Sequence, residues 1–234
     1  MFYRAETMLI AAAVLPALFL LIRVYKADRL ERESPGLIIR LVIRGALATF
    51  AAMITEEIGS ALLAFIFTRS SLITELLMYF FVVGLSEEGF KYLLLKGKTW
   101  KDPEFNCQFD GIVYAVSVSL GFALLENIGY VFMYGLETAL VRALTAVPGH
   151  ACFGVFMGVF YGAAKRYQHW NDPLASKLCR IGAVAVPVFL HGCYDFFAAS
   201  DSGDFTALFL IFVAAMFIGS LILIRHLSRH DRYI

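Results

Sequence analysis

The chain has 234 residues, of which 60% are hydrophobic and 17% are charged, and its mean hydropathy is +0.73. Soluble domains carry about 25% charged residues, so this composition excludes an ordinary soluble protein and predicts a polytopic membrane protein. The formal net charge of +1 gives no reason to expect a nucleic acid as a partner.

Apolar segments long enough to span a bilayer, which takes about 20 residues, follow one another along the whole chain. No linker divides them, so we expect one all-α helical bundle that covers residues 1–234 as a single domain. The amphipathic segment 136–147 would be a short surface or re-entrant helix, or else an eighth span. The seven predicted spans are 6–25, 37–67, 72–95, 110–134, 148–164, 180–199 and 205–225.

The basic residues predict the orientation of this bundle. Seventeen of the twenty lysines and arginines fall in the connections and flanks that follow the first, third, fifth and seventh spans. Only Arg4, Arg69 and Arg142 fall on the opposite side. Because cytoplasmic loops are rich in Lys and Arg, we expect an external N-terminus and a cytoplasmic C-terminus.

The third predicted span is interrupted by two acids and a lysine, Glu87, Glu88 and Lys91. An ionisable group inside a bilayer costs about 3 kcal/mol or more, so such groups commonly mark function. Positions i, i+3 and i, i+4 share a helix face, so Lys91 can pair with either carboxylate. Glu56 and Glu57, at the outer end of the second span, are interpreted as a solvated helix end.

Other ionisable groups lie at a similar depth in three more predicted spans. With a rise of ~1.5 Å per residue, the group lies roughly 15–24 Å from the cytoplasmic end of each span. Its members are Glu87, Glu126, His150, His191 and Asp195. A layer shared by four helices predicts one polar chamber between mid-membrane and the outer leaflet. His191 and Asp195 are spaced i, i+4, so the carboxylate can orient the imidazole.

Carboxylates and histidines in such a chamber can activate water for hydrolysis. A carboxylate can take a proton from water, and a histidine can donate to a developing oxyanion or bind a metal. Neither a GxSxG nor an HExxH motif is present. Two alternatives stay open, catalysis without a metal and a divalent metal such as Zn²⁺ bound by His150 and His191 with Glu87 or Glu126.

These motifs resemble the PrsW family of bacterial intramembrane proteases, which is similar to the CAAX prenyl protease and bacteriocin-processing superfamily. The resemblance is carried by EExxK at 87–91, FxxxEN at 122–127, the isolated His150, and HxxxD at 191–195. It implies that Glu87 activates water and that the histidines assist. The full candidate set is Glu87, Glu88, Glu126, His150, His191 and Asp195, with Lys91, Phe122 and Asn127 as supporting residues.

The resemblance also implies a location and a partner. The location is the bacterial cytoplasmic (inner) membrane, and the partner is a single-span membrane protein similar to an anti-sigma factor, cut first on the outer side during envelope stress. The residues alone leave two other functions open. Intramembrane acids and histidines also form proton or cation pathways in transporters, and a buried polar network can belong to a non-enzymatic membrane sensor.

Overall fold

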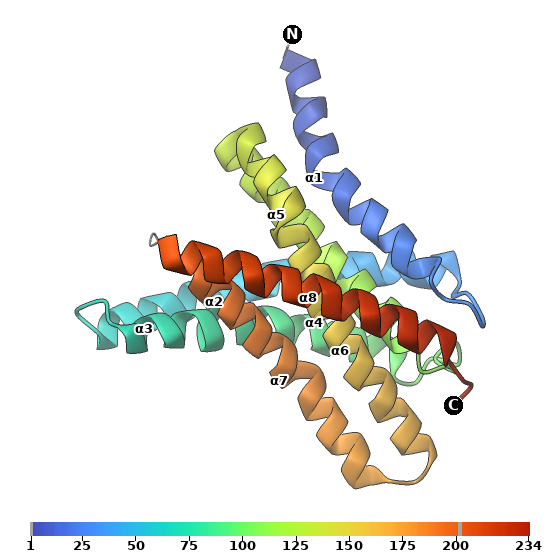
Figure 1. Cartoon of the computed structure of the whole chain (residues 1–234). Coiled ribbons are helices and arrows are strands. Elements are labelled where there is room, and N and C mark those ends of the chain that lie inside the picture. The colour runs from blue at the N-terminus through green and yellow to red at the C-terminus, as the bar shows by residue number, and fades with distance from the viewer. Residues whose placement is uncertain (1, 201–202) are drawn as a thin grey trace.

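The computed structural model describes residues 2–200 and 203–234, in which helices account for most of the chain and no β-strand occurs (Figure 1). Every predicted span falls on helical structure. The elements are α1 (Phe2–Tyr25), α2 (Pro35–Ile66), α3 (Leu72–Leu76), the π-helix η1 (Leu77–Gly84), α4 (Leu85–Thr99), α5 (Asp110–Leu144), α6 (Ala146–His169), α7 (Pro173–Ala198) and α8 (Gly203–Arg229).

Four helical stretches of the described residues are long and apolar enough to cross a membrane. The second of them combines α5 and α6, and α1 contributes a shorter apolar helix, Ile10–Tyr25. The four are Pro35–Ile66, Asp110–His169, Pro173–Ala198 and Gly203–Arg229. The protein is therefore an all-helical, multi-pass membrane protein, whereas the number of crossings and the orientation stay predictions.

Helix α5 forms the centre of the bundle, where it packs against α1, α2 and α6. Every residue from Asp110 to Ala123 is buried, as expected of a helix that is apolar on all sides and enclosed by others.

Glycines on α6 allow its backbone to contact the backbone of α5 directly, because they carry no Cβ. A Cβ on Gly158 would lie 2.4 Å from the Cα of Ile112, and a Cβ on Gly162 would lie 2.1 Å from the carbonyl oxygen of Gln108. The stripe of Gly154, Gly158 and Gly162 is thus a close helix contact, which is the packing role that its i, i+4 spacing predicts.

Helices α3, η1 and α4 follow one another without a break from Leu72 to Thr99. The π-helical part ends at Gly84, three residues before the first acid of the pair. Gly84 lies against α7, where its Cβ would be 3.1 Å from the carbonyl oxygen of Val188. A π segment changes the helical register, and such segments are frequent at functional sites.

Helix α5 folds back on itself at Gly135, whose φ of 84° is open to glycine at little cost. In an unbroken helix Glu126 and Arg142 would be about 24 Å apart, yet Nη2 of Arg142 lies 2.8 Å from Oε2 of Glu126. The amphipathic segment 136–147 is therefore mostly helical and returns toward the bundle (Figure 1).

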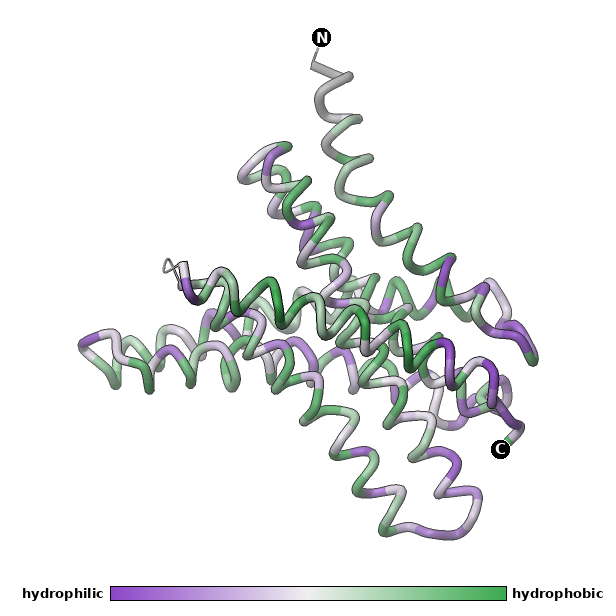
Figure 2. Tube along the Cα trace, in the orientation of Figure 1, coloured by the Kyte–Doolittle hydropathy of each residue, from purple (hydrophilic) through white to green (hydrophobic). Residues whose placement is uncertain are grey.

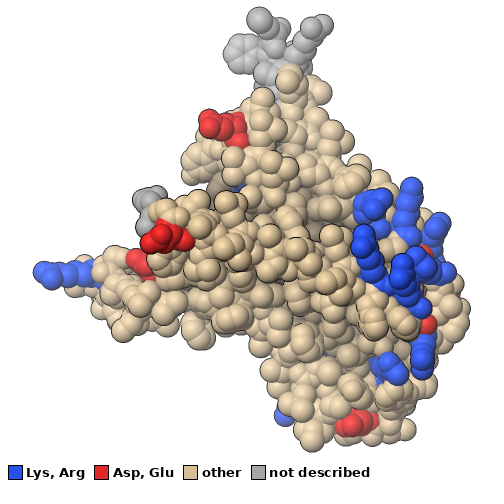
Figure 3. Space-filling model, in the orientation of Figure 1, with Lys and Arg blue, Asp and Glu red and all other residues tan. Residues whose placement is uncertain are grey.

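Apolar residues cover most of the helices, and polar residues concentrate at their ends and in the connections (Figure 2). Lys and Arg gather at the end of the molecule near the C-terminus (Figure 3). The predicted cytoplasmic C-terminus rests on this asymmetry.

Candidate active site

Lys91 lies at the centre of the polar group that the sequence predicts. Its side chain is fully buried, with Nζ 3.0 Å from Oε2 of Glu87 and 2.7 Å from Oε1 of Glu88. Nζ also lies 3.1 Å from Nδ1 of His150 and 3.9 Å from the ring centroid of Phe122. The predicted pairing of this lysine with an acid of its own helix is confirmed, and Lys91 contacts both acids.

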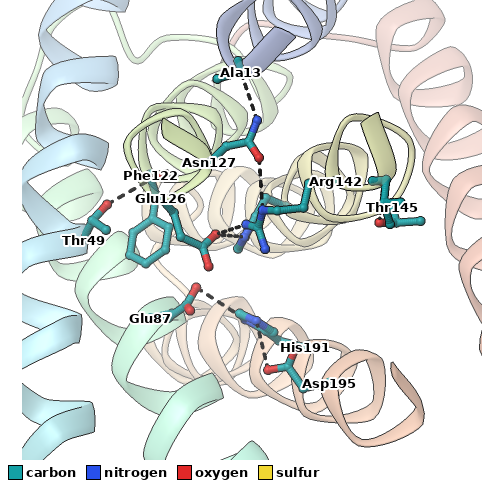
Figure 4. Close-up of polar contacts among 12 residues, drawn as sticks. Ala13, Thr49, Glu87, Phe122, Glu126, Asn127, Arg142, Thr145, His191 and Asp195 are labelled. Atoms are coloured by element: carbon teal, nitrogen blue, oxygen red, sulfur yellow. Dashed lines mark hydrogen bonds and ion pairs between the residues drawn. The ribbon is translucent and has the colours of Figure 1, made fainter. Parts of the chain in front are cut away.

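His191 reaches the same two acids from α7. Its Nδ1 lies 3.0 Å from Oε1 of Glu88 and 3.8 Å from Oε2 of Glu87. Its Nε2 lies 3.4 Å from Oδ2 of Asp195, one helical turn away (Figure 4). The contact predicted from the i, i+4 spacing is thus present, and carboxylates flank both ring nitrogens.

His150, on α6, joins Lys91 to Glu126. Because an ammonium group only donates, Nδ1 of His150 accepts from Lys91, and the ring proton belongs on Nε2. That proton is donated to Oε2 of Glu126 at 2.9 Å. The same carboxylate oxygen accepts from Arg142 at 2.8 Å, so Glu126 has two donors.

Asn127 and Phe122 hold this arrangement in place. Asn127 is buried; its Nδ2 donates to the carbonyl oxygen of Ala13 in α1, and its Oδ1 accepts from Nε of Arg142 at 3.0 Å (Figure 4). The Phe122 ring lies 5.7 Å from the imidazole of His150, centroid to centroid. Both residues therefore contact the polar group, and their supporting role stays a prediction.

These side chains surround a cavity of about 380 Å³. We call this site the chamber; its acids and histidines come from α2, α4, α5, α6 and α7. Glu87 lines the cavity, whereas Glu88 is fully buried behind it and its Oε2 has no partner among the described residues. The cavity is lined by Glu56, Glu87, Glu126, Arg142, His150, His191 and Asp195, together with Tyr79, Tyr130 and Tyr194.

Two charged residues of the chamber were missed by the sequence analysis. Glu56 was interpreted as part of a solvated helix end, but it lines the cavity, while its neighbour Glu57 is exposed. Arg142 was counted only as a basic residue of an external segment, because nothing in the sequence revealed the reversal at Gly135. The sequence feature that could have indicated both Glu56 and Arg142 is a charged residue next to an apolar segment.

The donor set in the chamber fits a divalent metal. Glu87, Glu88 and His191 each offer a ligand atom, and these atoms lie within 4.8 Å of one another. Three protein ligands with an open position are typical of catalytic zinc, and Oε2 of Glu88 is an available donor. The set contains Glu87 and His191, as predicted, but Glu88 replaces His150, both of whose nitrogens already have partners.

Comparison with known proteins identifies the family. The sequence profile described as PrsW family intramembrane metalloprotease matches residues 33–221. Protease PrsW of Halalkalibacterium halodurans is 37% identical over 187 residues, which are 80% of this chain and 81% of the relative. Protease PrsW of Oceanobacillus iheyensis is 35% identical over 210 residues (90% and 91%), and that of Bacillus subtilis is 34% identical over 194 residues (80% and 81%). No solved structure matches the chain.

The profile covers every helix that contributes to the chamber, from Glu56 on α2 to Asp195 on α7. The relatives match along most of their own length as well as most of this chain. The chain therefore belongs to the PrsW family of intramembrane metalloproteases.

Proposed function

We propose that this protease hydrolyses a peptide bond in the spanning segment of a membrane-anchored protein, using water activated in the chamber. The observation that carries the proposal is the convergence of acids and histidines from five helices on one cavity of about 380 Å³. Such a cavity can hold water and one substrate carbonyl away from lipid.

Glu87 is the general base in this proposal, because it is the glutamate of the pair that lines the cavity. Its Oε2 is held by Lys91, and the described residues give its Oε1 no hydrogen-bond partner. Glu87 takes a proton from water as the oxygen attacks the carbonyl carbon. It then gives the proton to the amide nitrogen as the C–N bond breaks, leaving a carboxylic acid and an amine.

His191 donates to the oxygen that becomes negatively charged. Glu88 holds its Nδ1 at 3.0 Å, while the 3.4 Å contact between Nε2 and Asp195 is long for a hydrogen bond. In the imidazolium form both ring nitrogens donate, so Nδ1–H stays with Glu88 while Nε2–H can exchange Asp195 for a substrate oxygen. A donor aimed at the developing oxyanion is typically among the larger catalytic contributions.

His150, Glu126 and Arg142 are positioning residues. They link α6 to both parts of α5 through hydrogen bonds of 2.9 and 2.8 Å, and His150 also fixes the Lys91 ammonium. If Glu87, Glu88 and His191 held a divalent metal, it would polarise the substrate carbonyl and acidify the attacking water, in place of the base and donor roles of Glu87 and His191.

The proposed substrate is a single-span membrane protein similar to an anti-sigma factor, cut first during an envelope-stress response. An open groove of about 460 Å³ supports a lipid-embedded substrate, because it lies between α2 and α5 and shares Glu56, Glu87 and Glu126 with the chamber. Apolar side chains from both helices line it, namely Phe50, Met53, Leu125, Ile128 and Met133.

The proposed topology is seven spans in the bacterial inner membrane, with an external N-terminus, a cytoplasmic C-terminus and one domain over residues 1–234. Cysteine labelling from either side tests it. A cysteine at Arg69 should react only from outside, and one at Lys101 only from inside; both residues are exposed. The reverse pattern would contradict the topology.

The proposed function is tested with the purified full chain and a single-span protein in liposomes. We expect cleavage within the spanning segment, toward its outer end, with the cut located by mass spectrometry of both products. Absence of cleavage, or a cut confined to the aqueous parts of the substrate, would refute intramembrane hydrolysis.

A further inference from the structure

Three segments that are distant in sequence meet near the C-terminus. They are the connection after α1, the connection before α5 and the tail after α8. The tail is fixed by hydrogen bonds from the backbone N of Ile234 to the carbonyl of Asn106 (2.6 Å) and from that of Gln108 to the carbonyl of Arg232 (3.4 Å).

Buried acids of the first segment and of the start of α5 face one another there, and a half-buried acid of the tail, Asp231, lies beside them. Asp28 (2% exposed), Glu33 (5%) and Asp110 (1%) each have a carboxylate oxygen within 4.8 Å of the others. Asp110 also forms such a group with Cys107 and Asp231. Among the described residues, no lysine or arginine forms an ion pair with any of these acids. We call Asp28, Glu33, Asp110 and Asp231 the terminal acidic cluster.

Backbone N–H groups hold one oxygen of two of these carboxylates and leave the other free. Oδ2 of Asp110 accepts from the N of Asn106 at 3.0 Å and of Cys107 at 2.6 Å, and Oδ1 of Asp231 accepts from the N of Phe109 at 2.9 Å. The second oxygen of each is buried without a partner, as are both oxygens of Asp28. Fixed carboxylates with free oxygens resemble ligands oriented for a cation.

Tyr114, which is not one of these acids, supplies a further buried polar group that a bound cation could contact. The Tyr114 side chain, on α5, is fully buried, and its hydroxyl makes no hydrogen bond of ordinary geometry among the described residues, although the Glu33 carboxylate lies close to it. The carboxylates of Glu33 and Asp110 exert the strongest electrostatic effect on this hydroxyl. A buried hydroxyl without a partner is unfavourable, so a bound cation would remove this cost together with the cost of burying the acids.

Charge repulsion and burial make the empty arrangement unfavourable. Burial, with a contribution from Asp231, raises the pKa of Asp28 to about 6. Burial raises the pKa of Glu33 to about 7; the nearby Tyr114 hydroxyl and Asp110 carboxyl lower it, and the charges of Glu104 and Asp28 raise it. A cation between these carboxylates would remove both costs.

We propose that the terminal acidic cluster binds one divalent cation of the oxygen-preferring class (Mg²⁺, Mn²⁺ or Ca²⁺) through Asp28, Glu33 and Asp110. The donors favour this class because they are carboxylates, with a tyrosine hydroxyl beside them. The cation would join the α1–α2 connection to the start of α5. This site is separate from the chamber and does not depend on the proteolytic mechanism.

The test measures Mn²⁺ binding by electron paramagnetic resonance with the full chain in detergent. His191→Ala is the background, since it removes a chamber ligand. We expect one Mn²⁺ per chain, Mn²⁺-dependent stabilisation against heat, and binding that is weakened about tenfold or more by Asp28→Asn. Glu31→Gln, an exposed acid of the same connection, should leave binding unchanged.

Several results would overturn the proposal. One is that the background protein neither binds Mn²⁺ nor is stabilised by Mg²⁺, Mn²⁺ or Ca²⁺. Another is that Mn²⁺ binding survives Asp28→Asn combined with Asp110→Asn. A third is that the background protein binds Zn²⁺ and none of the other three cations. If Asp28→Asn failed to fold, the thermal response of the background protein to the three cations would still decide between binding and none.

Discussion

The molecule contains two groups of buried carboxylates that differ in how their charge is balanced. In the chamber, Lys91 contacts Glu87 and Glu88 within 3.0 Å, and Arg142 contacts Glu126 at 2.8 Å. In the terminal acidic cluster, no described lysine or arginine forms such a pair. The chamber thus carries its own cations, while the cluster requires a proton or an external cation. Changing one charge should therefore have opposite effects on stability in the two regions.

The largest effect is expected from Lys91→Met, which removes the central cation of the chamber. Two buried carboxylates would lose their ammonium partner and keep only His191, and breaking a buried pair in this way costs about 3–5 kcal/mol. Thermal unfolding in detergent measures the loss. Lys101→Met, at an exposed lysine, should change little.

A second substitution sharpens the interpretation of this loss. Adding Glu88→Gln to Lys91→Met removes one of the two carboxylate charges that have lost Lys91, and it should restore part of the stability. If Lys91→Met were no more destabilising than Lys101→Met, the lysine would not balance the chamber acids.

A smaller effect is expected from Arg142→Gln, because Glu126 keeps its bond from His150 and both side chains of the ion pair are partly exposed. The expected loss of stability is about 1–2 kcal/mol, between the values for exposed and buried pairs. Cleavage should slow as well, since the segment after Gly135 loses its link to Glu126 and Asn127. Arg69→Gln, at an exposed arginine, is the matched control. Equal cleavage rates for the two variants would show that Arg142 has no positioning role.

The smallest effect, of opposite sign, is expected from Asp28→Asn in the presence of a chelator. Removing one charge from the uncompensated cluster should stabilise the protein by about 0.5–1 kcal/mol, the lower part of the range for improved charge arrangements. Added Mn²⁺ should stabilise the parent protein more than the variant. If Asp28→Asn lowered stability in chelator while Glu31→Gln did not, the cluster would already be balanced.

The sequence predicts those parts of the structure that depend on local spacing. Apolar length locates the helices, and the i, i+3 and i, i+4 rules correctly predict the contacts of Lys91 with Glu87 and Glu88 and that of His191 with Asp195. The common depth of the polar residues correctly groups His150 and Glu126 with them.

Contacts that depend on chain reversals could not be predicted in the same way. Arg142 reaches Glu126 only because α5 folds back at Gly135, and a single glycine does not reveal that reversal. The terminal acidic cluster joins residues 28, 33, 110 and 231, which share no spacing rule and meet only through packing of α1, α5 and the C-terminal tail.

The central claim is that Glu87 activates water in the chamber. The most direct measurement compares cleavage by Glu87→Gln and Glu57→Gln in liposomes, because both changes replace a glutamate with its isosteric amide and Glu57 is exposed outside the chamber. We predict that Glu87→Gln slows cleavage by about 10²–10⁴-fold, the usual contribution of a general base, while Glu57→Gln cleaves at the parent rate and both unfold as cooperatively as the parent. Cleavage by folded Glu87→Gln at the rate of Glu57→Gln would contradict the account.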